Sequence, residues 1–334
     1  MSATAMQHEA PGTGLFVRFF RGERVGKRSP RFGYLFAVLA AAISGVAVYV
    51  NSLGLRTFSD PVLYTALKDG FVGLLLLPLA VSPGWRAEYR RLNRRTWAWM
   101  VALALTGGSV PFALFFTGLK MTTAATGSLV NHFQFVLVAV FAVVFLKEAI
   151  RPAMWAGLAV LLLGTLFGTN LHALRWNQGA WLILASTVLF AIDFVIAKHL
   201  LRGLATLTVM TARMTIGTAM LFVFVIASGH LGQTAHLGLI QWRFVVITGL
   251  ILLAFTVTTF TAIRHASVSA VLAIGAAAPI ITTVLQVLST GRLKLTSIDV
   301  AGVAVILLAV VTVILMGLRQ DGRLARLEGA AAGT

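Results

Sequence analysis

The sequence contains no cysteine and few charged residues, and each shortage excludes a class of protein. Without cysteine the chain can form no disulfide, no thiolate nucleophile and no cysteine-ligated zinc site. Only 11% of its residues are charged, whereas a soluble domain is about a quarter charged. Because 58% of the residues are hydrophobic and the mean hydropathy is +0.91, we expect a membrane protein without a soluble domain of any size.

The ten acidic residues are too scattered to build a metal or acid–base cluster. None forms an Asp-x-x-Asp pair, and the seven histidines form no His-x-x-x-His pair. A polytopic membrane enzyme would need such clusters near a headgroup surface. We therefore predict no enzymatic activity, no metal site and no cofactor, and keep a membrane enzyme only as an alternative.

Long apolar runs follow one another along the whole chain, separated by short basic or Gly/Pro/Ser-containing breaks. A helix needs about 20 such residues to cross a bilayer, and runs without alternation are not the strands of a barrel. The expected fold class is therefore an all-α polytopic membrane protein. Its ten transmembrane helices are predicted over residues 33–55, 61–81, 97–119, 122–146, 153–171, 179–200, 207–229, 244–265, 266–289 and 298–318.

Lysine and arginine outnumber the acids and give a formal net charge of +17. With ten spans, most of these residues fall on the side that carries both termini, which the positive-inside rule makes cytoplasmic. Because they are divided among short loops, we predict no nucleic-acid partner. In the N-terminal tail, residues 1–32, Phe16, Phe19 and Phe20 interleave with arginines. This pattern is typical of a segment on anionic lipid and also of a solvated basic tail.

The two halves of the chain resemble each other at an offset of 144 to 145 residues. The matched pairs are Phe135 with Pro279, Glu148 with Arg292, Gly157 with Gly302 and Lys68 with Arg213. Because each half holds an odd number of helices, the second half must be inverted relative to the first. Such repeats are the architecture of many secondary transporters. We predict repeats at 33–171 and 172–318, followed by a cytoplasmic tail at 319–334.

One segment, "ATGSLVNHFQFVLVAVFAVVFLKEAIRPAMWAGLAVLLLG" (residues 125–164), resembles the EamA signature of the drug/metabolite transporter superfamily. The likeness extends over about residues 33 to 318 as two EamA repeats. It implies an inner-membrane carrier of small metabolites, often an exporter of amino acids or related compounds. Glu148 matches the family's glutamate, while Gln134 and Phe135 stand where it usually has Glu-Pro. We read Glu148 as structural, in the first turn of helix five just before Pro152.

Two charged residues lie in the middle of the predicted sixth and seventh helices. A charge at the bilayer centre costs ~2.5–3.5 kcal/mol, so it needs a partner or a water-filled cavity. Asp193 and Arg213 are each about eight residues, ~12 Å, from the cytoplasmic end of their helices. We therefore predict that they form an ion pair, which either ties two helices together or couples to transport.

Lys68 and Asp69 are adjacent in helix two, so their side chains point ~100° apart and cannot simply neutralise each other. Tyr49 and Asn51 of helix one reach the same level as Lys68 but supply no carboxylate. We interpret Lys68 as a counter-charge for an anionic or carboxylate-bearing substrate and Asp69 as a candidate proton acceptor. The alternative is that both residues only link helices.

Further candidate pathway residues are polar side chains and breaks in the apolar helices. Polar residues of helix four either bind substrate, with His132 as a proton shuttle, or bond to other helices. Glycine and proline either free backbone carbonyls and form hinges or allow close helix packing. The residues are Asn131, His132 and Gln134 in helix four, Gly107, Gly108 and Pro111 in helix three, Thr256 in helix eight and Pro279 in helix nine.

These observations together predict a secondary transporter that works by alternating access. The resemblance favours export of amino acids or related small metabolites across the inner membrane. Efflux of drugs or toxic compounds and uptake of a metabolite stay open as alternatives. The expected partners are a small-molecule substrate, the lipid bilayer and, as a coupling ion, the proton.

Overall fold

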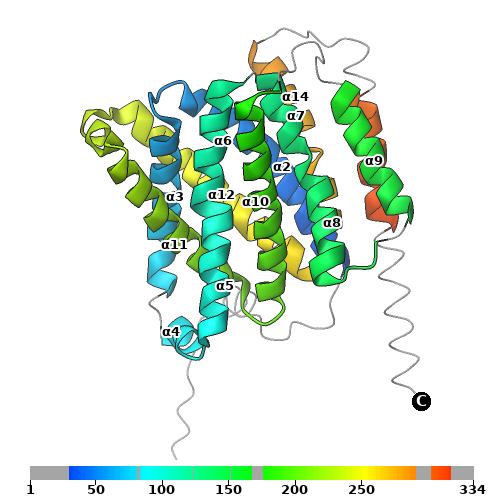
Figure 1. Cartoon of the computed structure of the whole chain (residues 1–334), viewed down its shortest axis with the longest axis horizontal. Coiled ribbons are helices and arrows are strands. Elements are labelled where there is room, and N and C mark those ends of the chain that lie inside the picture. Colours follow the sequence, from blue (N-terminus) through cyan, green and yellow to red (C-terminus); the bar gives the residue numbers. More distant parts are fainter. Residues whose placement is uncertain are drawn as a thin grey trace, which may run out of the picture.

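Uninterrupted Leu, Val, Ala and Ile runs leave the backbone no partner but itself, and the chain folds almost entirely into helices. The computed structural model describes residues 30–80, 83–122, 124–150, 152–167, 176–290 and 302–316 (Figure 1). Within these ranges every regular element is helical. The basic N-terminal tail up to residue 29, the C-terminal tail, Arg292 and Arg151 lie outside the described residues.

The first half contains α2 (Pro30–Leu55), α3 (Pro61–Ala80), α4 (Pro83–Arg90), α5 (Arg94–Ala104), the π-helical turn η1 (Leu105–Ser109), α6 (Val110–Met121), α7 (Ala124–His132), α8 (Gln134–Leu146) and α9 (Pro152–Phe167). The second half contains α10 (Gln178–Leu201), α11 (Thr206–Ala227), the 3-10 turn η3 (His230–His236), α12 (Leu239–His265), α13 (Val268–Gly275) and α14 (Ala278–Thr290). A last helix covers Gly302–Met316.

Eight segments of the described chain are long and apolar enough to cross a membrane. They cover Arg31–Leu55, Pro61–Pro78, Arg94–Met121, Leu129–Leu146, Gln178–Leu201, Thr206–Ala227, Leu239–His265 and Val268–Ser289. Two shorter apolar helices, Met154–Leu163 and Gly302–Met316, lie where the fifth and tenth spans were expected. The fold is therefore all-helical and polytopic, and ten spans stay a prediction.

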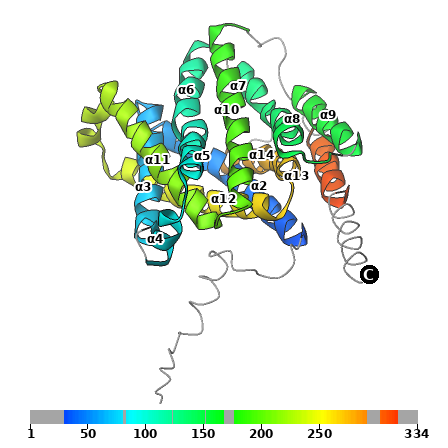
Figure 2. The same ribbon diagram turned by 60° about the horizontal axis from the view of Figure 1, so that its bottom comes forward.

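Helices of the first half pack on helices of the second half throughout the bundle. The α2 helix contacts α12, α13 and α14, whereas α10 contacts α5, α6, α7 and α8, and α3 contacts α11 and α12. Small residues let these backbones approach, because a Cβ on Gly118 of α6 would lie 2.5 Å from the carbonyl oxygen of Gly179 on α10. The last helix lies beside α9 at one edge of the bundle (Figures 1 and 2).

Three of the long apolar segments are broken within their length. The third contains the π-helical turn η1, and the eighth, Val268–Ser289, breaks at Ala276 and Ala277, just before Pro279. The fourth was expected to run unbroken over 122–146, and this was wrong: α7 ends at His132 and α8 begins at Gln134. The amide of Phe133 instead bonds the carbonyl of Val130 over 3.2 Å, a tighter turn that needs no proline.

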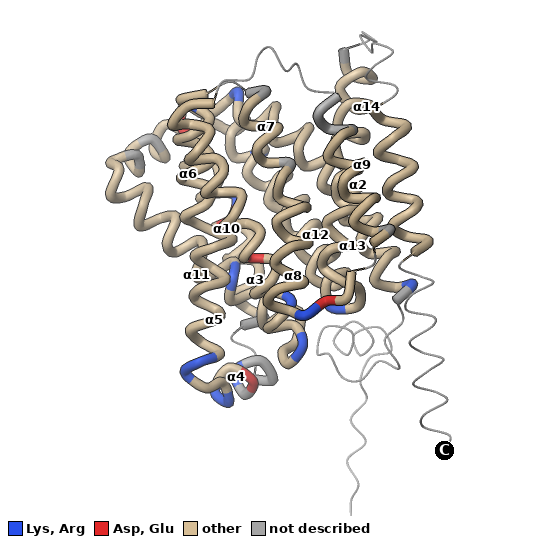
Figure 3. The backbone as a smooth tube through the Cα atoms, turned by 45° about the vertical axis from the view of Figure 1, so that its right-hand side comes forward, with Lys and Arg blue, Asp and Glu red and all other residues tan. Residues whose placement is uncertain are grey.

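The two ends of the bundle differ in charge. Most of the lysine and arginine segments drawn in Figure 3 lie at the end where the short helix α4 is found. We call this the α4 end. The chain leaves it in α2, reaches the opposite end before α3 begins at Pro61, and returns to it at Pro83.

Candidate functional site

Asp193 of α10 and Arg213 of α11 are brought together inside the bundle. Arg213 Nε donates to Asp193 Oδ1 over 3.2 Å, and Arg213 Nη2 donates to Oδ2 over 3.2 Å. The Asp193 side chain is 2% exposed and that of Arg213 15%. The guanidinium also lies 5.9 Å from the ring centroid of Phe260 on α12. Because two parallel hydrogen bonds join the pair, its orientation as well as its charge is fixed.

The π-helical turn η1 supplies a third partner to this pair. Arg213 Nη2 also donates to the carbonyl oxygen of Gly107 over 2.8 Å. A Cβ on Gly107 would overlap the carboxylate of Asp193, so only glycine fits there. One interpretation of the break was that it offers free carbonyls to the cargo. For Gly107 this was wrong, because a cation within the protein already binds the carbonyl.

The neighbouring residues of the break also make contacts within the bundle. A Cβ on Gly108 would lie 2.9 Å from the Cα of Gly217 on α11, so the two helices approach each other through glycines. The carbonyl of Pro111 accepts a hydrogen bond of 2.8 Å from Ser186 Oγ of α10. The interpretation of close packing through small residues therefore describes this segment.

Lys68 of α3 lies in a different environment, in which no carboxylate is in direct contact with its ammonium among the described residues. Its ammonium is 5.7 Å from the ring centroid of Tyr64. The single proton of the Tyr64 hydroxyl faces two acceptors, Asn51 Oδ1 on α2 at 2.9 Å and Thr248 Oγ1 on α12 at 3.0 Å. Within the ranges that the structure describes, no carboxylate lies within 4.0 Å of the Lys68 ammonium and no acceptor bonds it. The partly exposed cation thus meets a ring and a neutral hydrogen-bonded network.

Asp69 is a further charged residue of this region, and its charge interacts with those of both cations, Lys68 and Arg213. Its side chain is 7% exposed. It makes no ion pair within 4.0 Å with either cation among the described residues. Asp69 therefore belongs to the same charged region as the Asp193–Arg213 pair, a relationship that the sequence did not indicate.

The two cations occupy related places in the two halves. A Cβ on Gly249 of α12 would lie 3.4 Å from the carbonyl oxygen of Lys68, and one on Gly108 would lie 3.8 Å from that of Arg213. The backbone of each cation-bearing residue thus lies near a glycine of the other half. Their partners differ, because Arg213 bonds a carboxylate whereas Lys68 faces neutral groups.

Among the side chains that the structure describes, those of the other predicted pathway residues make no hydrogen bond to this region. Asn131 and Gln134 are partly buried on either side of the break at Phe133, and the side chain of His132 lies outside what the structure describes. Thr256 is buried and donates to the carbonyl of Leu252 in its own helix over 2.8 Å.

Tyr49 is partly buried, and Pro279 is exposed at the second position of α14. The two glycines of the predicted structural motif are both buried. Gly157 of α9 faces Val313 of the last helix, where a Cβ would meet Val313 Cγ2 at 3.5 Å. Gly302 is the first residue of that last helix.

Glu148 is structural, but the predicted helix was wrong. Its Oε1 accepts from the backbone amide of Val268 over 3.2 Å and its Oε2 from Ser269 Oγ over 3.2 Å. It therefore caps α13 in the second half. The reason is the turn before it, where Lys147 adopts a left-handed conformation (φ 55°) that ends α8.

Glu88 of α4 also caps a helix of the second half, and we did not predict this role from the sequence. It accepts from the amide of Ala205 over 3.2 Å and from Thr208 Oγ1 over 2.6 Å, at the start of α11. Ala205, the residue before that helix, offers no side-chain cap of its own. The available signal in the sequence was that Glu88 is a single acidic residue in a basic loop. Two carboxylates of the first half thus cap two helices of the second half at the α4 end.

Tyr89 adds a further contact between α4 and the start of α11. Its hydroxyl donates to the carbonyl of Thr208 over 3.2 Å, and its ring stacks on Trp97 with centroids 5.9 Å apart. Burial, and then the negative charge of Glu88, raise the pKa of Tyr89 to about 12. The tyrosine therefore stays a neutral donor at any ordinary pH.

Basic residues at the α4 end bind the carbonyls at helix C-termini. Lys198 donates to the carbonyl of Ile263 over 2.5 Å and to that of Ala266 over 2.7 Å, at the end of α12. Arg202 donates to Leu146, the last residue of α8, over 3.3 Å. These bonds, with the two carboxylate caps, close the α4 end of the bundle across both halves.

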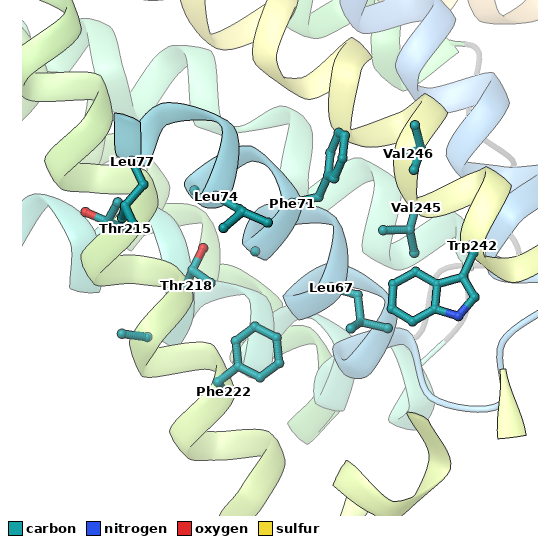
Figure 4. Close-up of a pocket in the computed structure, with 13 residues that line it drawn as sticks. Leu67, Phe71, Leu74, Leu77, Thr215, Thr218, Phe222, Trp242, Val245 and Val246 are labelled. Atoms are coloured by element: carbon teal, nitrogen blue, oxygen red, sulfur yellow. The ribbon is translucent and has the colours of Figure 1, made fainter. Parts of the chain in front are cut away.

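A separate groove lies on the outer side of α3, α11 and α12 (Figure 4). It has a volume of about 460 Å³ and is almost entirely apolar. Its labelled walls include Leu67, Phe71, Phe222 and Trp242. Because no charged side chain lines it, this groove is distinct from the region of Lys68 and Arg213.

Three comparisons with known proteins agree with this geometry. The EamA-like transporter family matches residues 31–169 and again 177–315. The "Uncharacterized transporter in cobO 3'region" of a Sinorhizobium species is 24% identical over 131 residues, which are 39% of this chain and 92% of that protein. A solved structure described as "Crystal structure of protein" is 21% identical and covers 85% of this chain and 98% of its own, with a TM-score of 0.67. This chain and that structure are therefore similar in fold.

Proposed function

The chain belongs to the EamA-like transporter family and is a multi-pass membrane protein, and we propose that it is a secondary transporter working by alternating access. The family match points to a transporter rather than an enzyme. The observation that carries the proposal is the match of the same family to each half of the chain. The cargo class that we propose is amino acids or related small metabolites, exported across the inner membrane.

Ten helices in two inverted halves are part of this proposal. The breaks at Phe133 and Ala277 are 144 residues apart, the offset at which the sequence repeats. The contact of α2 with α12 corresponds to that of α10 with α6, and the contacts of α2 with α13 and α14 to those of α10 with α7 and α8. Helix α9 and the last helix then complete the two sets of five.

We propose that the α4 end is cytoplasmic, with both termini on that side. The concentration of lysine and arginine at that end supports this orientation (Figure 3). The basic N-terminal tail would then meet the anionic cytoplasmic leaflet. Domain boundaries at 33–171 and 172–318 follow from the same assignment.

Glu88 and Glu148 form, in this account, the cytoplasmic gate. Each is a first-half carboxylate bonded to the start of a second-half helix, α11 and α13. Rocking of one half against the other toward an inward-open state would separate these bonds. The Asp193–Arg213–Gly107 contact lies deeper and joins α10, α11 and η1.

The pathway that we propose runs along helices one to four and six to nine. Asn131, His132 and Gln134 flank the break in helix four, and Thr256, Pro279 and Tyr49 belong to the same proposed route. Asp69 is the proposed proton acceptor, because it is the carboxylate of this region that no arginine or lysine holds within 4.0 Å among the described residues. Efflux of a toxic compound remains the second candidate for the cargo.

The test is an untargeted comparison of metabolites in medium and cells. Cells that express the chain are compared with cells that carry an empty vector, at matched growth. We expect at least one amino acid or related compound to rise in the medium and fall in the cells. A compound that instead accumulates inside the cells would contradict the proposed direction. No change in a broad panel of hosts and media would contradict transport of a common metabolite.

A further inference from the structure

The two intramembrane cations stand at equivalent places and have unequal partners. Resting on the proposed transport function, we propose that Lys68, with Tyr64, Asn51 and Thr248, forms a subsite that binds a carboxylate group of the cargo. The backbones of Arg213 and Lys68 each lie near a glycine of the other half. The two backbones therefore have similar neighbours, and the two cations differ in the side chains that surround them.

The positive charge of Arg213 is already balanced by a carboxylate of the protein. Its Nε and Nη2 bind both oxygens of Asp193, and Nη2 also binds the carbonyl of Gly107. The face of its guanidinium lies toward the ring of Phe260. The charge of Arg213 and the donors Nε and Nη2 are thus used within the protein, so this pair holds helices together.

Lys68 is in the opposite situation. An ammonium has three N–H donors, and none of them meets an acceptor or a carboxylate among the residues that the structure describes. The side chain is only partly buried. The ring of Tyr64 stabilises the cation without neutralising it. A partly buried intramembrane cation in this state is best completed by an anion from outside the chain.

The surroundings favour a group that carries a single negative charge. One lysine supplies a single positive charge, and Asp69 beside it already acts on both cations. A phosphate group carries about −1.5 to −2 near neutral pH and would leave negative charge uncompensated in the membrane. A carboxylate carries one charge and accepts hydrogen bonds at both oxygens. The Tyr64 hydroxyl has one proton, which now lies between Asn51 and Thr248, and it donates to a carboxylate by leaving these two acceptors.

The test uses the absence of cysteine, since one introduced thiol reports without background. Ala47 lies one turn before Asn51 on the same face of α2, and its carbonyl accepts from Asn51 Nδ2 over 2.7 Å. An Ala47→Cys chain, in membrane vesicles of both orientations, is labelled with an anionic ethylsulfonate and with a cationic ethyltrimethylammonium methanethiosulfonate reagent. The reporter leaves all four subsite residues in place.

We expect the anionic reagent to react faster, and the ratio of the two rates to fall about tenfold when Lys68→Met is added, since one nearby charge is then lost. Lys68→Arg should keep the preference. Ser52→Cys, an exposed position near the end of α2, is the matched control, and its ratio should change little. Sodium acetate should slow labelling by the anionic reagent at Ala47→Cys, whereas acetamide should not.

Three results would overturn the proposal. Equal rates for the two reagents whether or not Lys68 is present would show that it attracts no anion. No labelling of Ala47→Cys from either side would show that the region is sealed from water. Protection by inorganic phosphate but not by acetate would replace a carboxylate by a phosphate group. Because labelling requires no cargo, it can succeed where the metabolite comparison fails, and the two failures are distinguishable.

Discussion

Arg213 binds both oxygens of Asp193 inside the bundle, over two hydrogen bonds of 3.2 Å, and reaches the carbonyl of Gly107 with the same guanidinium. The consecutive helices α10 and α11 and the distant turn η1 are therefore held at one point. Elsewhere the described bundle is held by apolar packing, by bonds at its ends and by neutral interhelical hydrogen bonds such as that of Ser186 to Pro111. Changes at this point should affect stability more than any surface change.

Removing one member of the pair should destabilise the protein strongly. Arg213→Met leaves the Asp193 carboxylate buried without its partner, and breaking a buried pair in this way costs about 3–5 kcal/mol. The double variant Asp193→Leu/Arg213→Met leaves no unpaired charge and should be more stable than Arg213→Met alone. Thermal unfolding of the purified variants in one detergent measures both. A double variant less stable than the single one would contradict this account of the pair.

Gly107→Ala should destabilise the contact between Asp193, Arg213 and Gly107, because the added methyl group needs space there. The added methyl group would overlap the carboxylate of Asp193, and overpacking of this kind costs about 1–3 kcal/mol. Gly203→Ala is the matched control, because nothing lies within 4 Å of a Cβ at that position. The two variants are compared by their melting temperatures. Equal values would show that η1 moves freely to accommodate a side chain.

Removing the carboxylate caps should favour opening at the α4 end. Glu88→Ala and Glu148→Ala each remove a cap worth about 1 kcal/mol, and a change of this size alters an equilibrium about fivefold. We expect a single cysteine at Asn131 to react several-fold faster with a reagent applied to the cytoplasmic side. Arg95→Ala, which changes an exposed residue at the same end, should leave the rate unchanged. A lower rate in the cap variants would contradict the gate.

Tyr89 should make the protein less stable at high pH. Its pKa is raised to about 12 in the folded chain, against about 10 in an unfolded one. The folded state then binds more protons between these values, so stability is fully present below pH 10 and is lost as pH rises toward 12. Tyr89→Phe should lose less stability over this window. Denaturation at several pH values checks this, and parallel curves for the two proteins would contradict it.

The sequence indicated those features that depend on local chemistry or on depth. The all-helical fold follows from apolar runs, and the meeting of Asp193 with Arg213 follows from their equal distance from the helix ends. The break at Phe133 was not foreseen, because no proline or glycine marks it. The partners of Glu88 and Glu148 were not foreseen either, since each lies more than a hundred residues away along the chain.

Gly107 shows most clearly what could not be predicted from the sequence. Its glycine–glycine sequence indicated an irregular backbone, and a π-helical turn is there. Which group would take the freed carbonyl depends on how α11 packs against η1, and no local pattern encodes that contact. The same holds for the neutral network around Lys68, where Tyr64 is local but Thr248 belongs to the other half.

The most direct test of alternating access is labelling of a single cysteine at Asn131, beside the break in helix four, in right-side-out and inside-out vesicles. The account predicts that an aqueous reagent reaches this cysteine from each side, and that cross-linking the α4 end shut abolishes labelling from the cytoplasmic side only. A cysteine that is unreachable from both sides, or reachable from one side whatever the state of the α4 end, would contradict it.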